Sequence, residues 1–189
     1  MAANTRERLT RAAMDRFYRE GFRNVGLDQI LDDVGISKTA FYKHFRCKED
    51  LMVAALELQN EWLQRTFRDM LRRQGGRAAA DQLRALFDVV EQIIEQDGFH
   101  GCIFVNAAIE FPLPHDPVHQ LSARNKEAIV DIVHEVAERA GATEPERLAE
   151  ELCMIIDATY VGRVVTGDRA VIDRARRLAE RVIRSHLGD

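Results

Sequence analysis

Histidines and a cysteine, the residue types that most often bind transition metals, lie close together between residues 100 and 119. His115 and His119 have the i, i+4 spacing that would place two ligands on one face of a helix. Pro117 lies between them in a proline-rich stretch, and proline interrupts a helix. His100 and Cys102 lack the compact pairing of a structural zinc site. We therefore predict no metal site and keep metal sensing as an alternative function.

The same stretch contains the residue types of a thiol hydrolase, because Cys102 lies near His100 and Glu110. The sequence has no nucleophile elbow, no Gly-rich phosphate loop and no HExxH motif. A cysteine within an apolar segment is usually a small hydrophobic residue. We therefore expect no catalytic residue, no cofactor and no enzyme activity. A thiol enzyme or a small-molecule-binding module is kept as an alternative.

A different set of polar side chains, within residues 27–45, has the types and spacing that suit DNA. Two short apolar-periodic segments flank the turn at 34–37, as a helix-turn-helix requires. The second segment, Lys38–His44, is too short to be stable alone, so Phe41 and Phe45 must pack it against the rest. Lysine and threonine near a helix N-terminus can reach base edges, while tyrosine and lysine bind phosphates. The alternative is a solvated face on an ordinary helical hairpin. The side chains left facing outward are Lys38, Thr39, Tyr42, Lys43 and His44.

The net charge of −4 is unevenly distributed along the chain. Residues 1–48 contain ten Lys or Arg and six Asp or Glu, a net charge of +4, whereas residues 49–189 carry −8. The total argues against nucleic acid, because proteins that bind it usually present basic surfaces. The split places the basic part of the chain where the helix-turn-helix pattern lies, which is consistent with DNA as a partner.

Helices must position these side chains, and the 3.6-residue period of apolar residues predicts helices almost throughout. Gly21 and Gly35 are expected to end the first two helices, and Ser37 to cap the third. Phe111–Pro117 must be a loop because it contains three prolines, and Thr143 is expected to cap the helix that follows it. The nine expected helices cover the residues before 21, then 27–34, 38–44, 48–74, 77–97, 98–111, 118–140, 143–166 and 169–186.

Length and composition fit a globular protein of one or two domains. The 189 residues are 46% hydrophobic and 31% charged, which is enough apolar surface for a buried core. No apolar run approaches the roughly 18–20 residues that cross a bilayer. The first twenty residues carry eight charged side chains, so no signal-peptide core is expected there. Three widely spaced cysteines fit reduced thiols, and we expect a cytoplasmic protein with no membrane partner.

Residues Thr5–Met52 resemble the DNA-binding domain of the tetracycline-repressor (TetR) family of bacterial regulators. Two positions depart from the family pattern. Gly26 replaces the usual Ser or Thr cap of the second helix, and Cys47 replaces a small polar residue. The resemblance rests on Phe17-Tyr-Arg-Glu-Gly-Phe22, Asp28-Gln-Ile30, Val34-Gly-Ile-Ser-Lys-Thr-Ala-Phe-Tyr-Lys-His-Phe45 and Lys48-Glu-Asp-Leu51.

The resemblance implies an all-α fold with a three-helix DNA-binding domain, residues 1–52, and a helical effector-binding and dimerisation domain, residues 53–189. It also implies a repressor that binds a palindromic double-stranded operator as a homodimer and is released by a small-molecule effector. Tyr42 and Lys48 would then hold phosphates, and Ser37–His44 would be the recognition helix. The whole set expected at the DNA is Ser37, Lys38, Thr39, Ala40, Tyr42, Lys43, His44 and Lys48.

The resemblance implies an effector pocket in the acidic part of the chain, where Gly101–Phe111 loosely resembles a subset of the family's effector domains. A pocket needs an apolar lining and a few polar groups. For each aromatic candidate the alternative is plain core packing. Glu110 needs either a ligand or an arginine partner if it is buried. The candidates are Phe87, Phe99, Phe104, Phe111, Met154 and Tyr160 for the lining, with Asn106, Glu110 and His134 as polar contacts.

The last two helices carry wide apolar stripes, which we expect to form the dimer surface. Two such helices from each subunit would make a four-helix interface. The alternative is a bundle within one chain. The residues expected at the interface are Leu152, Ile156, Ala175, Leu178 and Val182.

Overall fold

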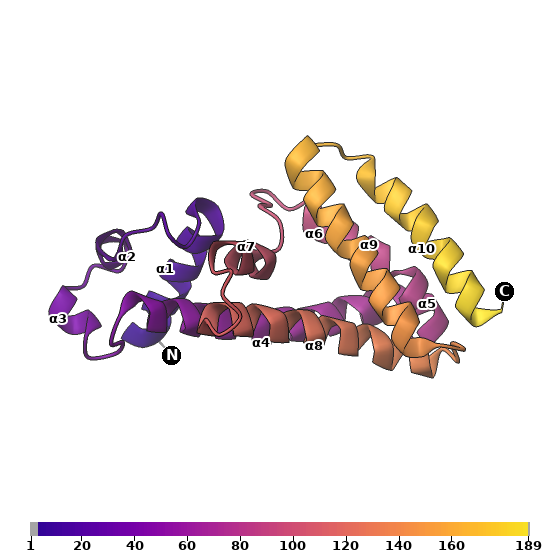
Figure 1. Cartoon of the computed structure of the whole chain (residues 1–189), viewed down its shortest axis with the longest axis horizontal. Coiled ribbons are helices and arrows are strands. Elements are labelled where there is room, and N and C mark those ends of the chain that lie inside the picture. The colour runs from indigo at the N-terminus through magenta and orange to yellow at the C-terminus, as the bar shows by residue number, and fades with distance from the viewer. Residues whose placement is uncertain (1–3, 189) are drawn as a thin grey trace. The chain divides into compact units, whose positions relative to one another are not determined.

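The computed structural model describes residues 4–188, so residues 1–3 and 189 of the two expected domains lie outside the described part. Every regular element in this range is a helix, which confirms the all-α class (Figure 1). The helices are α1 (Thr5–Glu20), α2 (Leu27–Val34), α3 (Lys38–Phe41), α4 (Lys48–Gly75), α5 (Ala79–Arg84), α6 (Leu86–Ile94), α7 (Ile103–Glu110), α8 (Pro117–Arg139), α9 (Pro145–Thr166) and α10 (Val171–Leu187).

The chain forms two compact units, and each consists of two stretches of sequence. Unit 1 comprises residues 1–62 and 103–125, and unit 2 comprises residues 63–102 and 126–189. Helices α4 and α8 each contribute to both units. Compactness therefore groups α7 and the first turns of α8 with the first three helices. The functional boundary that we expect after residue 52 is a different division, and it stays a prediction.

In unit 1 the ends of the first helices are fixed by local chemistry. Asn4 caps α1, because its Oδ1 accepts a hydrogen bond from the Glu7 N–H at 2.9 Å. Gly21 follows α1 with φ of 85°, a conformation that favours glycine. Gly26 has no side chain to cap α2, but Gln29 Oε1 accepts from the Gly26 N–H at 2.7 Å. This bond is one half of a capping box, and the half that a Ser or Thr hydroxyl would give to the first-turn amides is missing at Gly26.

Two later segments complete unit 1. Asp116 starts α8, because its Oδ1 accepts from the Val118 N–H at 2.8 Å, and Pro117 occupies the first helical position, where its missing N–H costs nothing. Asn125, fully buried on α8, donates from Nδ2 to Asn60 Oδ1 on α4 at 2.8 Å. Phe104 on α7 is completely buried. The segment 103–125 is therefore part of the core of this unit.

Unit 2 is a helical bundle around one apolar core. Helices α9 and α10 pack closely at Gly162, where an added Cβ would lie 2.9 Å from Val171 Cγ2. Arg176 on α10 pairs with Asp88 at 2.7 Å and with Glu91 at 2.9 Å on α6. The core residues from the last two helices include Leu148, Leu152, Ile156, Ile172, Ala175, Ala179 and Ile183.

Four expected boundaries are wrong. The helix expected over 98–111 begins only at Ile103. Helix α3 ends at Phe41, because the Lys43 and His44 amides bond three residues back, with His44 N–H donating to Phe41 O at 2.8 Å. The helix expected over 77–97 is interrupted at Ala85, between α5 and α6. Thr143 does not cap α9, because its N–H and its hydroxyl both bond to His186 O at the end of α10.

Within residues 4–188 no three His, Cys, Asp or Glu side chains come together as a possible metal site. His119 Nδ1 lies 2.8 Å from the Phe111 carbonyl oxygen. Over the same range, no helix combines the length and apolar character that crossing a bilayer demands.

Candidate nucleic-acid interface

The turn between α2 and α3 has the geometry of a helix-turn-helix. Gly35 adopts the left-handed conformation, with φ of 71°, and its N–H donates to Leu31 O at 2.8 Å. The Ile36 N–H bonds to the same oxygen at 3.1 Å, which closes the end of α2. Ser37 then caps α3, since its Oγ accepts from the Ala40 N–H at 3.2 Å. The chain thus reverses into α3 within three residues.

Aromatic packing holds the short helix α3 in place. Phe41 is completely buried and stacks on Phe45 with ring centroids 5.7 Å apart. The Arg6 guanidinium lies 4.7 Å from the centre of the Phe45 ring. A four-residue helix has almost no stability of its own. Its position is therefore set by these two anchored rings, as the sequence predicts.

The polar side chains of this segment face solvent. Lys38, Thr39, Lys43 and His44 are exposed, and Tyr42 is 59% exposed. The Tyr42 ring packs edge-on against the Phe41 ring, with the ring centroids 5.2 Å apart. The outward orientation expected for the five residues is what the structure has. Contact with DNA at these residues stays a prediction.

An ion pair links the start of α3 to the start of α2. Lys38 Nζ lies 2.9 Å from a carboxylate oxygen of Asp28, and the hydrogen bond to Asp28 raises the pKa of the lysine. Both side chains are exposed, so solvent screens the pair and it contributes little to stability. The lysine is therefore charged and able to exchange this partner for a phosphate or a base edge.

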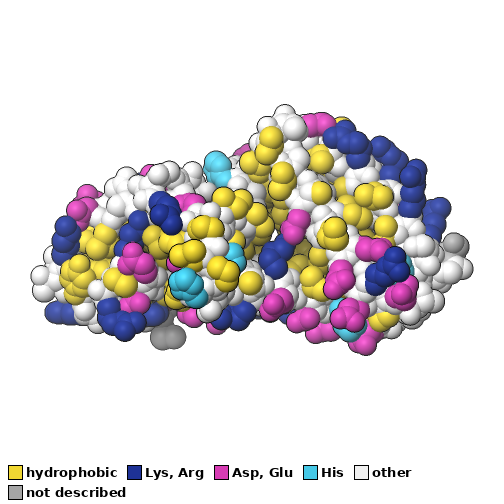
Figure 2. Space-filling model, viewed as in Figure 1, with side chains coloured by type: hydrophobic (Ala, Val, Ile, Leu, Met, Phe, Trp, Pro, Cys, Tyr) yellow, Lys and Arg dark blue, Asp and Glu magenta, His cyan; other side chains and the backbone are white. Residues whose placement is uncertain are grey.

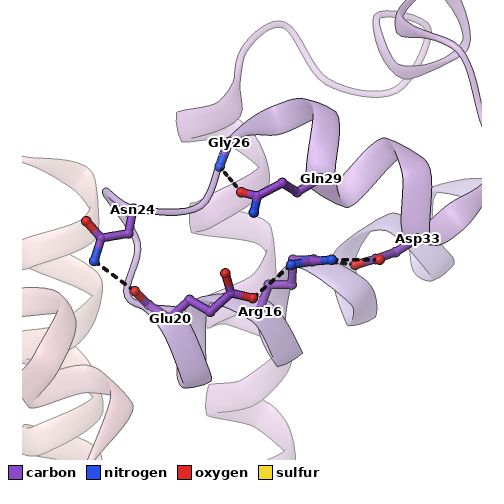
Figure 3. A network of polar contacts seen from close by, with 6 residues as sticks. All are labelled: Arg16, Glu20, Asn24, Gly26, Gln29 and Asp33. Atoms are coloured by element: carbon purple, nitrogen blue, oxygen red, sulfur yellow. Dashed lines mark hydrogen bonds and ion pairs between the residues drawn. The ribbon is translucent and has the colours of Figure 1, made fainter.

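A polar network that the sequence did not reveal fixes α2 against α1 (Figure 3). Arg16 on α1 binds the Asp33 carboxylate on α2 through two nitrogens, and its Nη1 donates to Glu20 at 2.8 Å. The hydrogen bond from Arg16 lowers the pKa of Asp33 and raises that of the guanidinium. Arg8 adds a bond of 2.6 Å from its Nη2 to Val34 O. The arginines of α1 thus orient the helix that leads into the turn.

Lys48 is arranged differently from the other residues expected at the DNA. Its Nζ donates to the Phe22 carbonyl oxygen at 2.8 Å and lies 5.9 Å from the centre of the Phe17 ring. Burial lowers the pKa of this lysine, while Glu49 and Glu110 act in the opposite direction. Lys48 therefore has an internal structural role that the sequence reasoning missed, and its phosphate contact stays a prediction.

The residues expected to bind an effector are divided between the two units. Phe104, Asn106, Glu110 and Phe111 belong to unit 1, and the other five belong to unit 2. Phe104 is completely buried, which matches the core-packing alternative. The Glu110 carboxylate accepts hydrogen bonds from two backbone amides, those of Phe22 and Arg23. Its partner is therefore the main chain and not the arginine side chain that we weighed against a ligand.

In unit 2 the expected effector residues are not all enclosed. The rings of Phe99 and Tyr160 contact each other edge-on at 5.5 Å, and Phe87 is buried in the core. His134 Nε2 lies 3.8 Å from Glu138 on the same helix. Met154 is 71% exposed on the outer face of α9, so it does not line an enclosed site within this chain. The expectation for Met154 is corrected, because it lies on the side of α9 opposite the core.

The expected dimer residues likewise need correction. Leu152, Ile156 and Ala175 are buried in the core of unit 2 and are unavailable to a second subunit. Leu178 is half exposed, and Val182 is partly buried against the core. The stripe that we expected at the interface is therefore mainly the face that packs within one chain.

The exposed apolar residues of α9 lie on its opposite face. Figure 2 shows hydrophobic side chains gathered over the end of α9 that leads into Gly167. Met154, Val161 and Val165 are separated by seven and four residues, so they lie on one side of the helix. Their exposed fractions are 71%, 55% and 76%. A second apolar stripe in α9 was the sequence pattern that could have identified this surface.

Both parts of the chain match family models. Residues 9–55 match the model described as bacterial regulatory proteins, tetR family. Residues 79–179, more than half of the chain, match the model described as the tetracyclin repressor-like, C-terminal domain. The first match covers most of α1, then α2, α3 and the start of α4, and the second covers α5–α9 and part of α10.

Individual proteins agree with these matches. The chain is 24% identical to the HTH-type transcriptional regulator YjdC of Escherichia coli (strain K12), over 95% of this chain and 93% of that protein. It is 32% identical to the HTH-type transcriptional activator FasR of Mycolicibacterium smegmatis, over 75% of this chain and 63% of that protein. A TetR-family transcriptional regulator of Streptomyces coelicolor has a TM-score of 0.87 at 28% identity, covering 96% of this chain and 95% of that one. Proteins of this family bind DNA and act as dimers, and the relatives are transcriptional regulators. The chain belongs to the TetR family of bacterial transcriptional regulators.

Proposed function

We propose that this regulator binds a palindromic operator as a homodimer through α3 and that a small-molecule effector alters the affinity. The observation that carries the DNA contact is the anchored α3, whose buried Phe41 turns Lys38, Thr39, Tyr42, Lys43 and His44 to solvent. Lysine and threonine at the start of α3 are suited to base edges, and Tyr42 and Lys43 after it to phosphates. Ser37 contributes by capping α3, and the small side chain of Ala40 permits close approach to a base.

The test uses a DNA fragment that the wild-type protein selects from a random-sequence pool. We expect Tyr42→Ala with Lys43→Ala to weaken binding to specific and non-specific DNA alike. The salt dependence of the affinity should fall by about one phosphate contact per subunit, or about two for the dimer, because only the lysine charge displaces a counterion. The matched control is Arg177→Ala, an exposed arginine on α10 in unit 2. An unchanged salt slope in the double variant contradicts the phosphate assignment.

We infer that the dimer surface is the outer face of α9 with the neighbouring flank of α10. Its central residues are Met154, Val161, Val165 and Leu178, which are exposed apolar side chains on the last two helices of unit 2. Exposed apolar stripes of this kind are stabilised by burial against a partner. A two-fold operator requires a two-fold protein, so a self-complementary surface also fits the DNA contact.

Sedimentation tests this surface. Val161→Glu with Val165→Glu should give monomers, because two charges would be buried without partners. Ile109→Glu is the matched control, since Ile109 is an exposed apolar residue of unit 1 at 72%. Dimers that persist in the double variant, or monomers in the control, contradict the assignment. The monomeric variant should also lose affinity for the two-half-site DNA fragment.

The effector would act by a population shift, because it binds one conformation better than another and DNA affinity changes by that difference. The proposed contacts in unit 2 are Phe99 and Tyr160, which already touch, with His134 as a polar candidate. FasR, the M. smegmatis relative, is named as an activator. A reporter driven by the selected fragment, with and without the protein, gives the sign of regulation here, and we propose repression. Increased reporter output contradicts it.

A further inference from the structure

The turn that connects α1 to α2 is held by a carboxylate from a distant part of the sequence. Glu110, the last residue of α7, accepts a hydrogen bond from the Phe22 N–H through Oε1 at 3.0 Å. Its Oε2 accepts from the next amide, that of Arg23, at 2.8 Å. Hydrogen bonds to an ionised carboxylate are about twice as strong as neutral ones. One side chain thereby fixes two consecutive peptide groups.

Gly21, the residue before these two amides, leaves room for the Glu110 carboxylate. Gly21 has φ of 85°, where a side chain is strained. A Cβ on Gly21 would also lie 3.1 Å from Glu110 Oε1, closer than most van der Waals contacts. The glycine thus permits both the backbone turn and the approach of the carboxylate.

The contact is reciprocal. Arg23 Nε donates to the backbone oxygen of Glu110 at 2.9 Å, and its guanidinium lies 5.0 Å from the centre of the Phe111 ring. The rings of Phe22 and Phe111 meet edge-on at 6.2 Å. We call these four residues, Phe22, Arg23, Glu110 and Phe111, the Glu110 clasp. All of them belong to unit 1.

The clasp joins the turn before α2 and α3, which we call the DNA-reading helices because DNA contact is proposed there, to a helix that falls within the C-terminal family model. Phe22 bonds to α7 through its N–H and to Lys48, the first residue of α4, through its carbonyl oxygen. The turn leads directly into α2 and, through Gly35, into α3. Helix α7 follows residue 102, where the preceding stretch of unit 2 ends, and it falls within residues 79–179 of that model.

We propose that Glu110 is a positioning residue that couples α7 to the DNA-reading helices. While its carboxylate holds the two amides, the α1–α2 turn moves together with α7. When the two separate, α2 and α3 lose that constraint. This inference rests on the proposed DNA contact of α3. Coupling between two sites is reciprocal in free energy, so DNA bound at α3 must alter α7 if α7 alters DNA binding. Selected DNA can therefore serve as the probe, without an effector.

Hydrogen exchange of the full-length protein, with and without the selected DNA fragment, tests the coupling. In the wild type we expect saturating DNA to slow exchange in α2 and α3 and also in residues 103–110. In Glu110→Gln the slowing at α2 and α3 should remain, and the slowing at 103–110 should be lost. The glutamine keeps one acceptor and turns an NH₂ group toward the other amide. Without DNA, the Phe22 and Arg23 amides should exchange about tenfold faster in Glu110→Ala.

Two controls separate the possible failures. Ile109→Ala changes an exposed side chain on the same helix and should behave as the wild type. Equal slowing at 103–110 in the wild type and in Glu110→Gln overturns the coupling role, as does a wild type in which DNA protects only α2 and α3. If DNA protects neither α2 nor α3 in the wild type, the proposed DNA contact itself fails, and the coupling fails with it. If the alanine variant does not fold, the nearly isosteric glutamine variant decides the question.

Discussion

The ammonium of Lys48 donates a hydrogen bond to the carbonyl oxygen of Phe22 at 2.8 Å and so fastens the start of α4 to the turn after α1. The N–H of the same Phe22 donates to Glu110 Oε1 at 3.0 Å. A basic residue near the helix-turn-helix therefore acts on the fold, whereas the lysine on the exposed turn after α3, Lys43, has no such bond among the described contacts.

We therefore expect substitution of Lys48 to lower the stability of the fold and substitution of Lys43 to leave it unchanged. Lys48→Met should lower the free energy of unfolding by about 1–2 kcal/mol, because a partly buried carbonyl loses a charged donor. Lys43→Met should leave the urea midpoint unchanged and weaken DNA binding. Urea unfolding followed by circular dichroism, with a filter-binding titration on the same samples, measures both. Equal loss of stability in the two variants contradicts the internal role of Lys48.

The Arg16–Asp33 pair predicts an acid-sensitive contribution to the stability of unit 1. Arg16 holds the pKa of Asp33 below its usual value, so the pair stabilises the fold above the ordinary carboxyl pKa of about 3.9. That contribution disappears as the pH falls through the lower folded pKa. Asp33→Asn should therefore lower the urea midpoint at pH 7, and the difference from the wild type should shrink below about pH 4. Asp32→Asn, an exposed neighbour on α2, is the control. A difference that stays constant down to pH 2 rules out the ionic origin.

Gly75 predicts a large steric effect at the end of α4. A Cβ there would lie 2.3 Å from the Gln82 Cα and 2.5 Å from the Gln82 N, which are backbone atoms that cannot rotate away. Gly75→Ala should cost about 3 kcal/mol, the upper range for overpacking. A Cβ on Gly76 would have no atom within 4 Å, so Gly76→Ala is disfavoured only by the left-handed φ of 66°. We expect it to lower the free energy of unfolding by about 1–2 kcal/mol. Thermal unfolding of both variants measures the difference, and similar melting temperatures would contradict the close approach.

The burial of Cys153 predicts that its thiol does not react with alkylating reagents in the native protein. Burial raises its pKa to about 12, Asp157 acts in the same direction, and Lys126 opposes them. The thiolate is the reactive form, so at pH 8 almost none is present. Iodoacetamide should modify the partly exposed Cys47 and Cys102 first and reach Cys153 only in urea. Mass spectrometry of the native protein after a time course measures this order, and early modification of Cys153 would show that the site opens readily.

The helix-turn-helix segment was predictable from sequence because its signals are local. Gly35 provides the left-handed turn, Ser37 provides the cap, and the spacing of Phe41 and Phe45 marks the buried side. The end of α3 at Phe41 was not predictable, because the change to tighter three-residue bonds depends on how the two rings are packed.

The effector and dimer residues were harder to predict from sequence, because an apolar stripe on a helix can pack against its own chain or against a partner. Leu152 and Ile156 face the core. Met154 and Val165, on the opposite side of α9, face solvent although they are equally apolar residues. Helix α9 is apolar on both sides, so its period alone could not separate the internal face from the external one. Burial in the folded chain separates them.

Short-range patterns of residue type predicted the helical class, the position of the helix-turn-helix and the family. The partners of residues that are far apart in the chain became visible only in the folded protein. Glu110 lies 87 positions from Arg23 and binds its amide, and Arg16 binds Asp33 across two helices. The residues that flank a carboxylate in sequence do not identify its hydrogen-bond partner, because the partner comes within reach only when the helices pack together. Glu110, a candidate ligand contact in the sequence, is in the folded protein the hydrogen-bond acceptor that holds the turn between α1 and α2.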